Sequence, residues 1–345
     1  MPPKKRPTHR DVAQLAGVSP GVVSYVINNG PRPTSPQVRE RVLRAIDELG
    51  YRPNALARNL RSLRTNTIGY IFSDYNPRSV FTSSYSATIL AGIVDEVKAR
   101  ERYLMVYPVG VGENLAQLEH LLTSGLLDSV VVRLAQDPPD TDPLLALIHE
   151  TGLPCVCIER PGNPQFNFPS VTYDDVGGAY AATRYLIAQG HRRIAHLRGD
   201  MHYPSARLRL QGYQQALTEA HLPIDERLIY GSAWTPKDAA AGVRHFLENS
   251  DPPTAIFAAN DDFAFVAIEI LRENGYRIPS DIAVIGFDDI LMAQEMTPAL
   301  TSVRIPLLEL GRRVVDLVLH QPSNPEDRSA TTIILPVELI RRETA

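Results

Sequence analysis

The stretch THRDVAQLAGVSPGVVSYVIN, residues 8–28, predicts two short helices joined at a glycine. Thr8 is placed to cap the first helix, and Asp11, three residues later, completes an acidic variant of the capping box. Gly17 breaks this helix, and the Ser-Pro pair soon after it suits the cap and first turn of the next one. A helix, a short turn with glycine and a second helix form the helix-turn-helix pattern, which places its second helix in the major groove of DNA.

Apolar side chains at helical spacing predict a small core for this segment. On the first helix, Val12, Leu15 and Ala16 are expected to form one buried face. A third helix is expected to begin after the cap Ser35 and to end at Gly50. Its apolar stripe, which would close a three-helix core, comprises Val38, Val42, Ala45, Ile46 and Leu49.

Charge is divided unevenly along the chain. The net charge is -4, yet residues 1–66 contain 12 Lys and Arg against 4 Asp and Glu. A basic head on an acidic body draws a polyanion to the N-terminus, where phosphate contacts release counterions. The basic segment NALARNLR, residues 54–61, has the length of only two helical turns, which is marginal without packing partners. We therefore expect this segment to fold when DNA is present.

From Ile68 onward, short apolar runs alternate with helical stretches. Examples are the runs IGYIF, residues 68–72, and AIFAA, residues 255–259. This alternation predicts parallel sheets with helices on both faces, because nearly continuous apolar strands need both faces covered. The runs fall into two series, which predicts two doubly wound lobes. Ligands of such sheets bind beyond the carboxyl ends of the strands, here in the cleft between the lobes.

Length and composition restrict the class of protein. A chain of 345 residues is too long for one ordinary core, so we expect two or three domains. The basic N-terminus is not followed by the apolar region of a signal peptide, and no apolar run reaches the length of a membrane span. Cys155 and Cys157 share one face of an expected buried strand. Without other cysteines or histidines nearby, they indicate core packing and not a metal site or a disulfide. We expect a cytoplasmic protein with no membrane partner.

Sequence motifs for enzymatic chemistry are absent. The chain has no G-x-S-x-G, H-E-x-x-H, Walker A or strand-associated G-x-G-x-x-G motif, and its nine histidines are scattered. The adjacent Asp261 and Asp262 are better explained by capping at a helix start. We therefore expect no enzyme, no metal and no cofactor. A second rival, an extracytoplasmic sugar-binding protein without a DNA role, is disfavoured by the basic head and by the lack of a signal peptide.

Motifs along essentially the whole chain resemble the LacI/GalR family of transcriptional regulators. The DNA-binding part is carried by DVAQLAGVS (residues 11–19) and AIDELGYRPN (45–54). The core is carried by GHRRI (190–194), SARLRLQGY (205–213) and IAVIGFD (282–288), in the order that the family has. The resemblance implies a homodimer that reads a pseudo-palindromic DNA operator, is nucleoid-associated when bound to it, and binds a small effector between its core lobes.

The fold class that this resemblance implies is α/β. A three-helix helix-turn-helix headpiece and a hinge helix are joined to a two-lobed, periplasmic-binding-protein-like core of doubly wound parallel sheets. The expected domains are residues 1–52 for the headpiece, 53–66 for the hinge helix and linker, and 67–345 for the effector-binding and dimerisation core. The expected first lobe is about 67–169 plus 299–330, and the second is about 170–298 plus 331–345.

The recognition helix departs from the family's pattern. Positions that usually present polar side chains to bases hold Pro20 and Gly21, and a position that often holds arginine is Tyr25. In the family a hinge-helix leucine, here Leu60, wedges between base pairs in the minor groove. We therefore expect an operator read less by direct polar contacts and more by hinge insertion and DNA shape. The expected DNA-binding residues are Thr8, Ser19, Pro20, Gly21, Ser24, Tyr25, Asn28, Asn54, Ala57, Leu60 and Arg61.

The residues that the family places in its effector cleft suit a polyhydroxyl ligand. An aromatic face stacks on the apolar side of a sugar ring, while carboxylates, amides and arginine bond its hydroxyls. Asp174 is expected to begin a helix and not to contact the ligand. The expected effector-binding residues are Tyr203, Ser205, Arg209, Trp234, Asn260, Asp288, Asp74 and Tyr85.

The predicted function is that of a sequence-specific DNA-binding regulator controlled by a small molecule. The family default is a repressor, and the cleft residues favour a sugar or a sugar derivative. An activator, or a purine-type repressor that depends on a corepressor, remains the alternative. The sequence does not decide the effector, the operator or the sign of regulation.

Overall fold

The computed structural model describes residues 7–27, 34–52, 65–74, 76, 78–134, 143–160, 166–322 and 324–345. The chain divides into two compact units, Met1–Thr65 and Asn66–Ala345, which are described separately. Within the described ranges, no helix combines the length and the apolar character needed to cross a membrane.

The first unit is the expected three-helix headpiece. It contains α1 (His9–Ala16), α2 (Pro20–Ile27) and α3 (Pro36–Leu49). The predicted capping box is confirmed, because the Thr8 hydroxyl accepts from the Asp11 amide and the Asp11 carboxylate accepts from the Thr8 amide. Gly17 ends α1 with φ 65°, a left-handed conformation that glycine adopts at no steric cost. The buried core comprises Val12, Ala13, Ala16, Val23, Val26, Val42 and Ala45.

One predicted core residue of the headpiece is wrong. Leu15 is 46% exposed, whereas Ala13 is 3% exposed and joins the core. With about 100° per residue, Val12, Ala16 and Ala13 span one arc of α1, and Leu15 lies about 60° outside that arc. Spacing alone made Leu15 look like a partner of Val12, but the partner helices contact the other flank.

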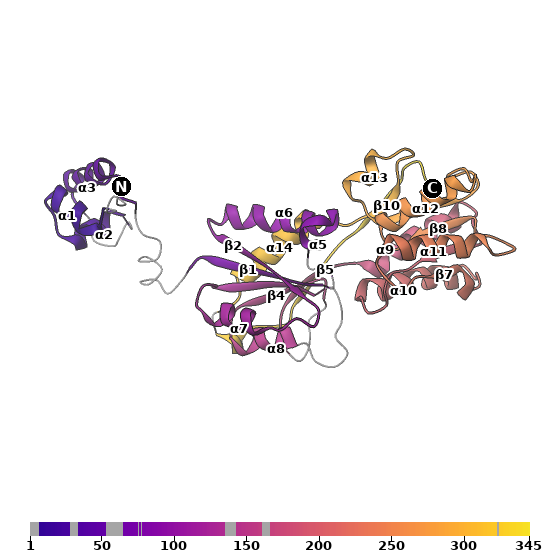
Figure 1. Cartoon of the computed structure of the whole chain (residues 1–345), viewed down its shortest axis with the longest axis horizontal. Coiled ribbons are helices and arrows are strands. Elements are labelled where there is room, and N and C mark those ends of the chain that lie inside the picture. Colours follow the sequence, from indigo (N-terminus) through magenta and orange to yellow (C-terminus); the bar gives the residue numbers. More distant parts are fainter. Residues whose placement is uncertain are drawn as a thin grey trace. The chain divides into compact units, whose positions relative to one another are not determined.

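The first lobe of the second unit is built on a six-stranded sheet with the strand order β11-β5-β4-β3-β1-β2 (Figure 1). All its described pairings are parallel. The strands are β1 (Thr67–Asp74), β2 (Tyr103–Gly110), β3 (Ser129–Leu134), β4 (Cys155–Ile158), β5 (Ser170–Tyr173) and β11 (Thr332–Leu335). The helices are α5 (Ser79–Thr82), α6 (Ser84–Ala99), α7 (Ala116–Thr123), α8 (Pro143–Glu150) and α14 (Leu307–Leu319), with a 3-10 turn η2 (Pro325–Asp327).

The second lobe has its own six-stranded sheet, with the order β12-β10-β9-β8-β6-β7. Its pairings are parallel except for the antiparallel edge strand β12. The strands are β6 (Ile194–Leu197), β7 (Ile229–Tyr230), β8 (Ala255–Ala258), β9 (Ala283–Asp288), β10 (Thr301–Arg304) and β12 (Glu338–Ile340). The helices are α9 (Asp175–Ala188), α10 (Pro204–Glu219), α11 (Pro236–Leu247), α12 (Asp261–Glu273) and α13 (Leu291–Glu295), with a 3-10 turn η1 (Glu226–Leu228).

Three segments cross between the lobes, and they lie later in the chain than predicted. The expected boundaries put β5 and β11 in the second lobe and β10 in the first. The structure has each of these strands in the opposite lobe. The chain therefore crosses after β5, after β10 and after β11. A buried parallel strand reads as an apolar run whichever sheet it joins, so local sequence does not reveal its neighbours.

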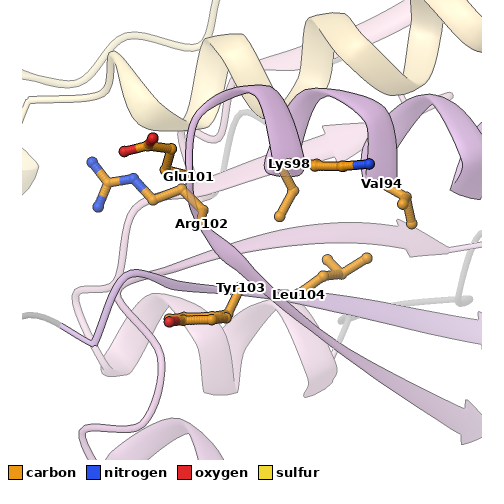
Figure 2. Close-up of a pocket in the computed structure, with 7 residues that line it drawn as sticks. Val94, Lys98, Glu101, Arg102, Tyr103 and Leu104 are labelled. Atoms are coloured by element: carbon orange, nitrogen blue, oxygen red, sulfur yellow. The ribbon is translucent and has the colours of Figure 1, made fainter. Parts of the chain in front are cut away.

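The strand β2 is an edge of the first sheet and is incompletely covered. Most of its residues are half-buried, and Tyr103 at its start is 59% exposed. Beside it, α6 exposes Val94 by 45%. Figure 2 shows Val94 and Lys98 on α6 above Tyr103 and Leu104 on β2.

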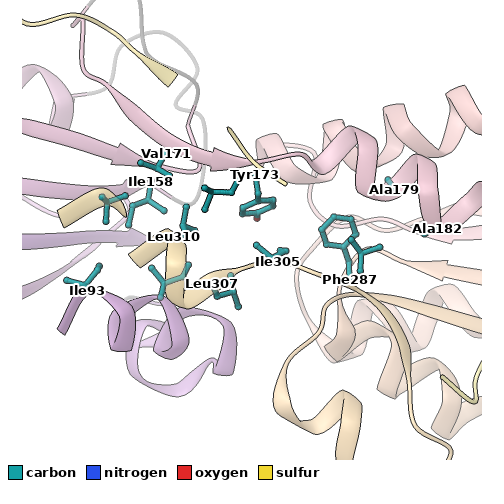
Figure 3. Close-up of a cluster of buried hydrophobic side chains, with 14 of the residues drawn as sticks. Ile93, Ile158, Val171, Tyr173, Ala179, Ala182, Phe287, Ile305, Leu307 and Leu310 are labelled. Carbon is teal, nitrogen blue, oxygen red and sulfur yellow. The ribbon is translucent and has the colours of Figure 1, made fainter. Parts of the chain in front are cut away.

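A single hydrophobic cluster extends from one lobe into the other through the crossover segments. Figure 3 shows its first-lobe members, such as Leu310, near Tyr173 and Ile305, with Phe287 and Ala179 on the second-lobe side. Each lobe also has one further hydrophobic cluster of its own. Cys155 and Cys157 are free thiols within one of them, which confirms the expected core packing. The shared cluster therefore fills the crossover region with buried apolar side chains from both lobes.

Candidate functional site

A cleft of about 420 Å³ opens between the two lobes. Its walls are formed where the strands end, as parallel sheets require. β1, β5 and β9 contribute their last residues, which are Asp74, Tyr173 and Asp288. The structure brings all eight predicted effector residues to this one cleft, and they come from both lobes: Asp74, Tyr85, Tyr203, Ser205, Arg209, Trp234, Asn260 and Asp288.

Arg209, in the second turn of α10, is the buried cation of the second-lobe wall. Its side chain is 3% exposed, and its Nε donates to Asp175 Oδ1 at 2.7 Å. One Nη donates to the Ala259 carbonyl, and the other donates to the Tyr173 hydroxyl at 3.2 Å. The guanidinium also stacks on the Phe287 ring, 3.9 Å from its centroid. These contacts fix the guanidinium group of Arg209 between the strand ends of both lobes.

Two buried carboxyl groups flank this guanidinium. Burial raises the pKa of Asp175 to about 6, although Arg209 opposes the shift. Burial also raises the pKa of Asp288 well above its usual range, again against Arg209, whose Nη1 is 3.6 Å from Asp288 Oδ1. That Oδ1 atom accepts no hydrogen bond from the described residues. A buried acceptor without a partner is costly, so it is suited to receive a ligand hydroxyl.

The first-lobe wall is a chain of polar side chains. Arg133, at the end of β3, donates from Nε to Glu159 Oε2 at 2.8 Å and from Nη1 to Ser86 at 3.2 Å. The Tyr85 hydroxyl donates to the other oxygen of Glu159 and lies 2.7 Å from the Tyr173 hydroxyl. Since Tyr173 also accepts from Arg209, the hydrogen bonds continue from the first lobe to the second beside the first crossover.

An aromatic surface lines the second-lobe side of the cleft. The ring of Trp234 contacts Tyr203 edge-on at a centroid distance of 5.9 Å and Phe263 at 5.4 Å. Gly199 lets the indole approach the backbone, because a Cβ there would lie 2.1 Å from the ring. The Tyr203 hydroxyl donates across the cleft to Asp74 Oδ1 at 3.3 Å. The two lobes are thus joined by a direct hydrogen bond at this point.

The expected capping role holds for Asp174 and is incomplete for Asp261. Asp174 is the N-cap of α9, where its side chain accepts from the Gly177 amide. Asn260 lines the cleft and also caps α12, accepting from the Phe263 amide at 2.9 Å. Asp261 is more than a cap residue, because it is fully buried and accepts from Ser302 Oγ at 2.5 Å and from the Ile290 amide at 2.8 Å. Burial raises the pKa of Asp261 to about 7.

Several polar residues of the cleft were not predicted. They share one signal, a single polar side chain at or just after the end of an apolar strand, and they include Arg133, Glu159, Tyr173 and Asp175. The same signal is present in the sequence at these positions, but no family motif accompanies it there. Among the described residues, no group of three or more His, Cys, Asp and Glu side chains is arranged to hold a metal ion.

Backbone conformation is unusual at the same strand ends. Asp288 has φ 114° and Asp289 has φ 56°, and Glu159, after β4, has φ 62°. Non-glycine residues rarely adopt positive φ, and such strain gathers at ligand sites when the surrounding structure enforces it. Here the strain turns Asp288 and Glu159 toward the cleft walls that they help to form.

On the headpiece, α2 has one buried side and one accessible side. Val23 and Val26 are buried, whereas Gly21 lies on the exposed side and Ser24 and Tyr25 are half-buried. With about 100° per residue, the last three group opposite the two valines. Thr8 is committed to the cap of α1. Ser19 and Pro20 are exposed at the start of α2, and the expected contact residues Asn28, Asn54, Ala57, Leu60 and Arg61 lie outside the described residues.

Comparisons with known proteins agree with this arrangement. Residues 8–54 match the family described as bacterial regulatory proteins, lacI family, and residues 183–345 match the periplasmic binding protein-like domain. The HTH-type transcriptional regulator CelR of Thermobifida fusca is 36% identical over 346 residues, with 100% of each chain covered. A solved CelR–cellobiose complex is 34% identical, with a TM-score of 0.74 and coverage of 99% of this chain and 100% of that one.

A second solved structure, the lac repressor dimer bound to operator and the anti-inducer ONPF, is 27% identical with a TM-score of 0.83. It covers 99% of both chains. The names of these relatives are those of a transcriptional regulator and of a repressor bound to its operator. The helix-turn-helix headpiece, the two-lobed core and full-length similarity to such proteins lead to one conclusion: the chain belongs to the LacI family of bacterial regulatory proteins and is a DNA-binding regulator of transcription.

Proposed function

We propose that this chain is a repressor whose affinity for its operator is set by a sugar bound between the core lobes. The observation that carries the proposal is the cleft that gathers all eight predicted effector residues. Trp234 offers an aromatic platform, and Asp288 offers a buried oxygen, Oδ1, that accepts no hydrogen bond from the described residues. An aromatic platform beside carboxylate acceptors matches the alternating apolar and hydroxyl surfaces of a pyranose. The cellobiose bound by the related CelR supports the same ligand class.

A path from the cleft to the DNA-binding part is provided by β1. Its last residue, Asp74, lines the cleft and accepts from Tyr203 of the opposite lobe. Its first residue, Thr67, directly follows the proposed hinge segment 53–66. A ligand that replaces the Tyr203–Asp74 bond changes how the lobes are held together. β1 carries this change to the hinge, because a strand paired on both sides moves as a unit.

DNA binding is assigned to residues 1–52, with the hinge segment 53–66 as a second contact. In the recognition helix, Gly21, Ser24 and Tyr25 lie opposite the buried valines, and we propose that this side of the helix enters the groove. Of these side chains, only Tyr25 is large. Leu60 is proposed as the minor-groove wedge, whose cost of a few kcal/mol per unstacked step is offset by the larger interface on bent DNA. The operator is therefore read mainly through its deformability.

The second copy of a homodimer is assigned to the incompletely covered edge of the first lobe. β2 presents unpaired backbone groups and an apolar surface with Val94, Tyr103 and Leu104 (Figure 2). Edge strands expose backbone groups that proteins pair or shield with another segment. A second copy of the chain would shield this one, and the related lac repressor was solved as a dimer. α13 exposes two further apolar side chains, Leu291 by 66% and Met292 by 53%. Both surfaces would be buried in a parallel pair of cores.

The experiment that tests the proposal uses the full chain. An operator is first selected from random double-stranded DNA, and its affinity is then measured by fluorescence anisotropy at fixed salt. A panel of neutral sugars, sugar phosphates and nucleobases is added in turn. We expect at least one sugar to raise the melting temperature and to change operator affinity at least tenfold.

The control is Trp234→Leu, which removes the aromatic platform of the cleft. This variant should keep its affinity for the operator and should need at least tenfold more sugar for the same response. Regulation by a nucleobase alone would refute the sugar proposal. Failure to enrich any DNA sequence would refute the operator proposal. A reporter with the operator placed over its promoter separates repression from activation.

A further inference from the structure

Acidic side chains outnumber basic ones in the lining of the cleft. The only basic side chains among its described lining residues are Arg133 and Arg209. The acidic ones are Asp74, Glu159, Asp175, Asp200, Asp262 and Asp288. Six carboxyl groups thus face the same space as two guanidinium groups. This balance is a property of the ligand space itself, because the same side chains provide its walls.

Both guanidinium groups are already committed to partners in the protein. Arg133 is held by Glu159 and Ser86, and its guanidinium lies over the rings of Phe72 and Tyr85, 5.2 Å from each centroid. Arg209 is held in the same manner by Asp175, a backbone carbonyl and Tyr173. A phosphate or carboxylate on a ligand would have to break one of these buried pairs to gain a cation. Breaking a buried pair leaves its carboxylate without a partner, which is strongly unfavourable.

The acidic side chains include acceptors that remain available. The Oδ1 atom of Asp288 is buried and receives no hydrogen bond from the described part of the chain. Asp262 lines the cleft on the first turn of α12, and no described residue bonds it. Among the described residues, the Asp74 side chain accepts from two hydroxyl groups and one backbone amide. The cleft therefore provides hydrogen-bond acceptors, and a ligand that fits it carries hydrogen-bond donors.

We propose that the cleft selects glycans that carry hydroxyl donors and no anionic group, so that sugar phosphates and sugar acids are excluded as effectors. This inference rests on the proposed sugar function and narrows its ligand class. One pair of like charges about 6 Å apart, at an effective dielectric constant of about 20, lowers affinity by about a hundredfold. An anion in this cleft faces more than one such pair.

The test compares a matched series on the full chain by titration calorimetry at pH 7.5. The probes are cellobiose, its 6-phosphate and its aldonic acid, together with the same three forms of every neutral sugar that raises the melting temperature. We expect the neutral member to bind and both anionic members to bind at least a hundredfold more weakly. Inorganic phosphate should give no heat of binding.

Two variants separate charge from shape. Asp262→Asn removes one charge with little change in size. Because Asp262 is exposed to solvent, which screens its charge, the affinity of the anionic members should improve only about tenfold relative to the neutral one. Asp251→Asn, on the surface where Asp251 is 74% exposed, is the matched control and should change neither affinity. Equal or tighter binding of a phosphorylated or acidic member overturns the inference while leaving the sugar function intact. Binding of no sugar in any form refutes the sugar function and the inference with it.

Discussion

Gly199→Ala gives the sharpest test of how the cleft is built, because it displaces the Trp234 ring and leaves the tryptophan itself unchanged. A Cβ at position 199 would lie 2.1 Å from the Trp234 ring, and its next two ring contacts would be 2.2 and 2.6 Å. Ordinary contacts begin near 3.4 Å, so the ring must move by about 1.3 Å. The ring packs on Tyr203 and Phe263, so this displacement disturbs its contacts with both side chains.

The expected effect is a weaker platform and not an unfolded protein. Displacing one aromatic contact surface costs about 1.4 kcal/mol of binding free energy, which is about tenfold in the Kd of the sugar. Trp234 is the only tryptophan of the chain, so the fluorescence of the full-length protein reports this ring alone. We expect a shifted emission maximum before sugar is added and a smaller change on addition.

Gly69→Ala is the matched control for this experiment. A Cβ there would meet Leu127 Cδ1 at 2.8 Å, in the first-lobe sheet and away from the cleft lining. It should lower the melting temperature while leaving the tryptophan emission and the sugar Kd unchanged. If Gly199→Ala leaves both the emission spectrum and the sugar Kd at their wild-type values, the platform assignment of Trp234 is refuted.

Three further changes have expected outcomes. Thr8→Ala removes the α1 capping box and should destabilise the headpiece by about 1 kcal/mol, seen as faster amide exchange in α1 and unchanged exchange in the core. Leu60→Ala should weaken operator binding at least tenfold with an unchanged sugar Kd; equal operator affinity would refute the wedge. Burial lowers the pKa of His196 to about 4, so the unfolded chain binds its proton first and stability falls as pH drops below about 6.5. Urea unfolding at pH 7 and pH 5 should show that His196→Phe loses about 2 kcal/mol less than wild type; a parallel loss would contradict this.

The local elements could be predicted because their signals are local. The capping box at Thr8, the caps Ser35 and Asp174, and the alternation of apolar strands with helices each depend on residues close in sequence. Leu15 was misplaced because its burial depends on which flank of α1 the other helices contact. The lobe boundaries were misplaced for a related reason, since β5, β10 and β11 are defined by partners far away in the chain.

The cleft shows the same division between local and non-local information. Family motifs pointed to Arg209, Asn260 and Asp288, and the structure brings these side chains together. They did not point to Arg133 or Glu159, which matter through contacts with residues from other strands and helices. The residues that line the cleft could thus be predicted from sequence, but the pairing of its two arginines with carboxylates of the protein could not. That pairing is the property that narrows the ligand class.

The hydrogen-bonded chain from Glu159 through Tyr85 and Tyr173 to Arg209 and Asp175 ties binding to lobe position. Tyr173 lies at the end of β5, where the chain first crosses between the lobes, so any change in lobe angle alters its bond to Arg209. A ligand that engages the Arg209 side of the cleft therefore acts on the same bonds that hold the lobes. We infer that substitutions within this hydrogen-bonded series of side chains will alter both the affinity for the sugar and the change in operator affinity that the sugar causes. Changes at Trp234, whose indole nitrogen has no hydrogen-bond partner among the described residues, will alter affinity and leave the size of the saturated response unchanged.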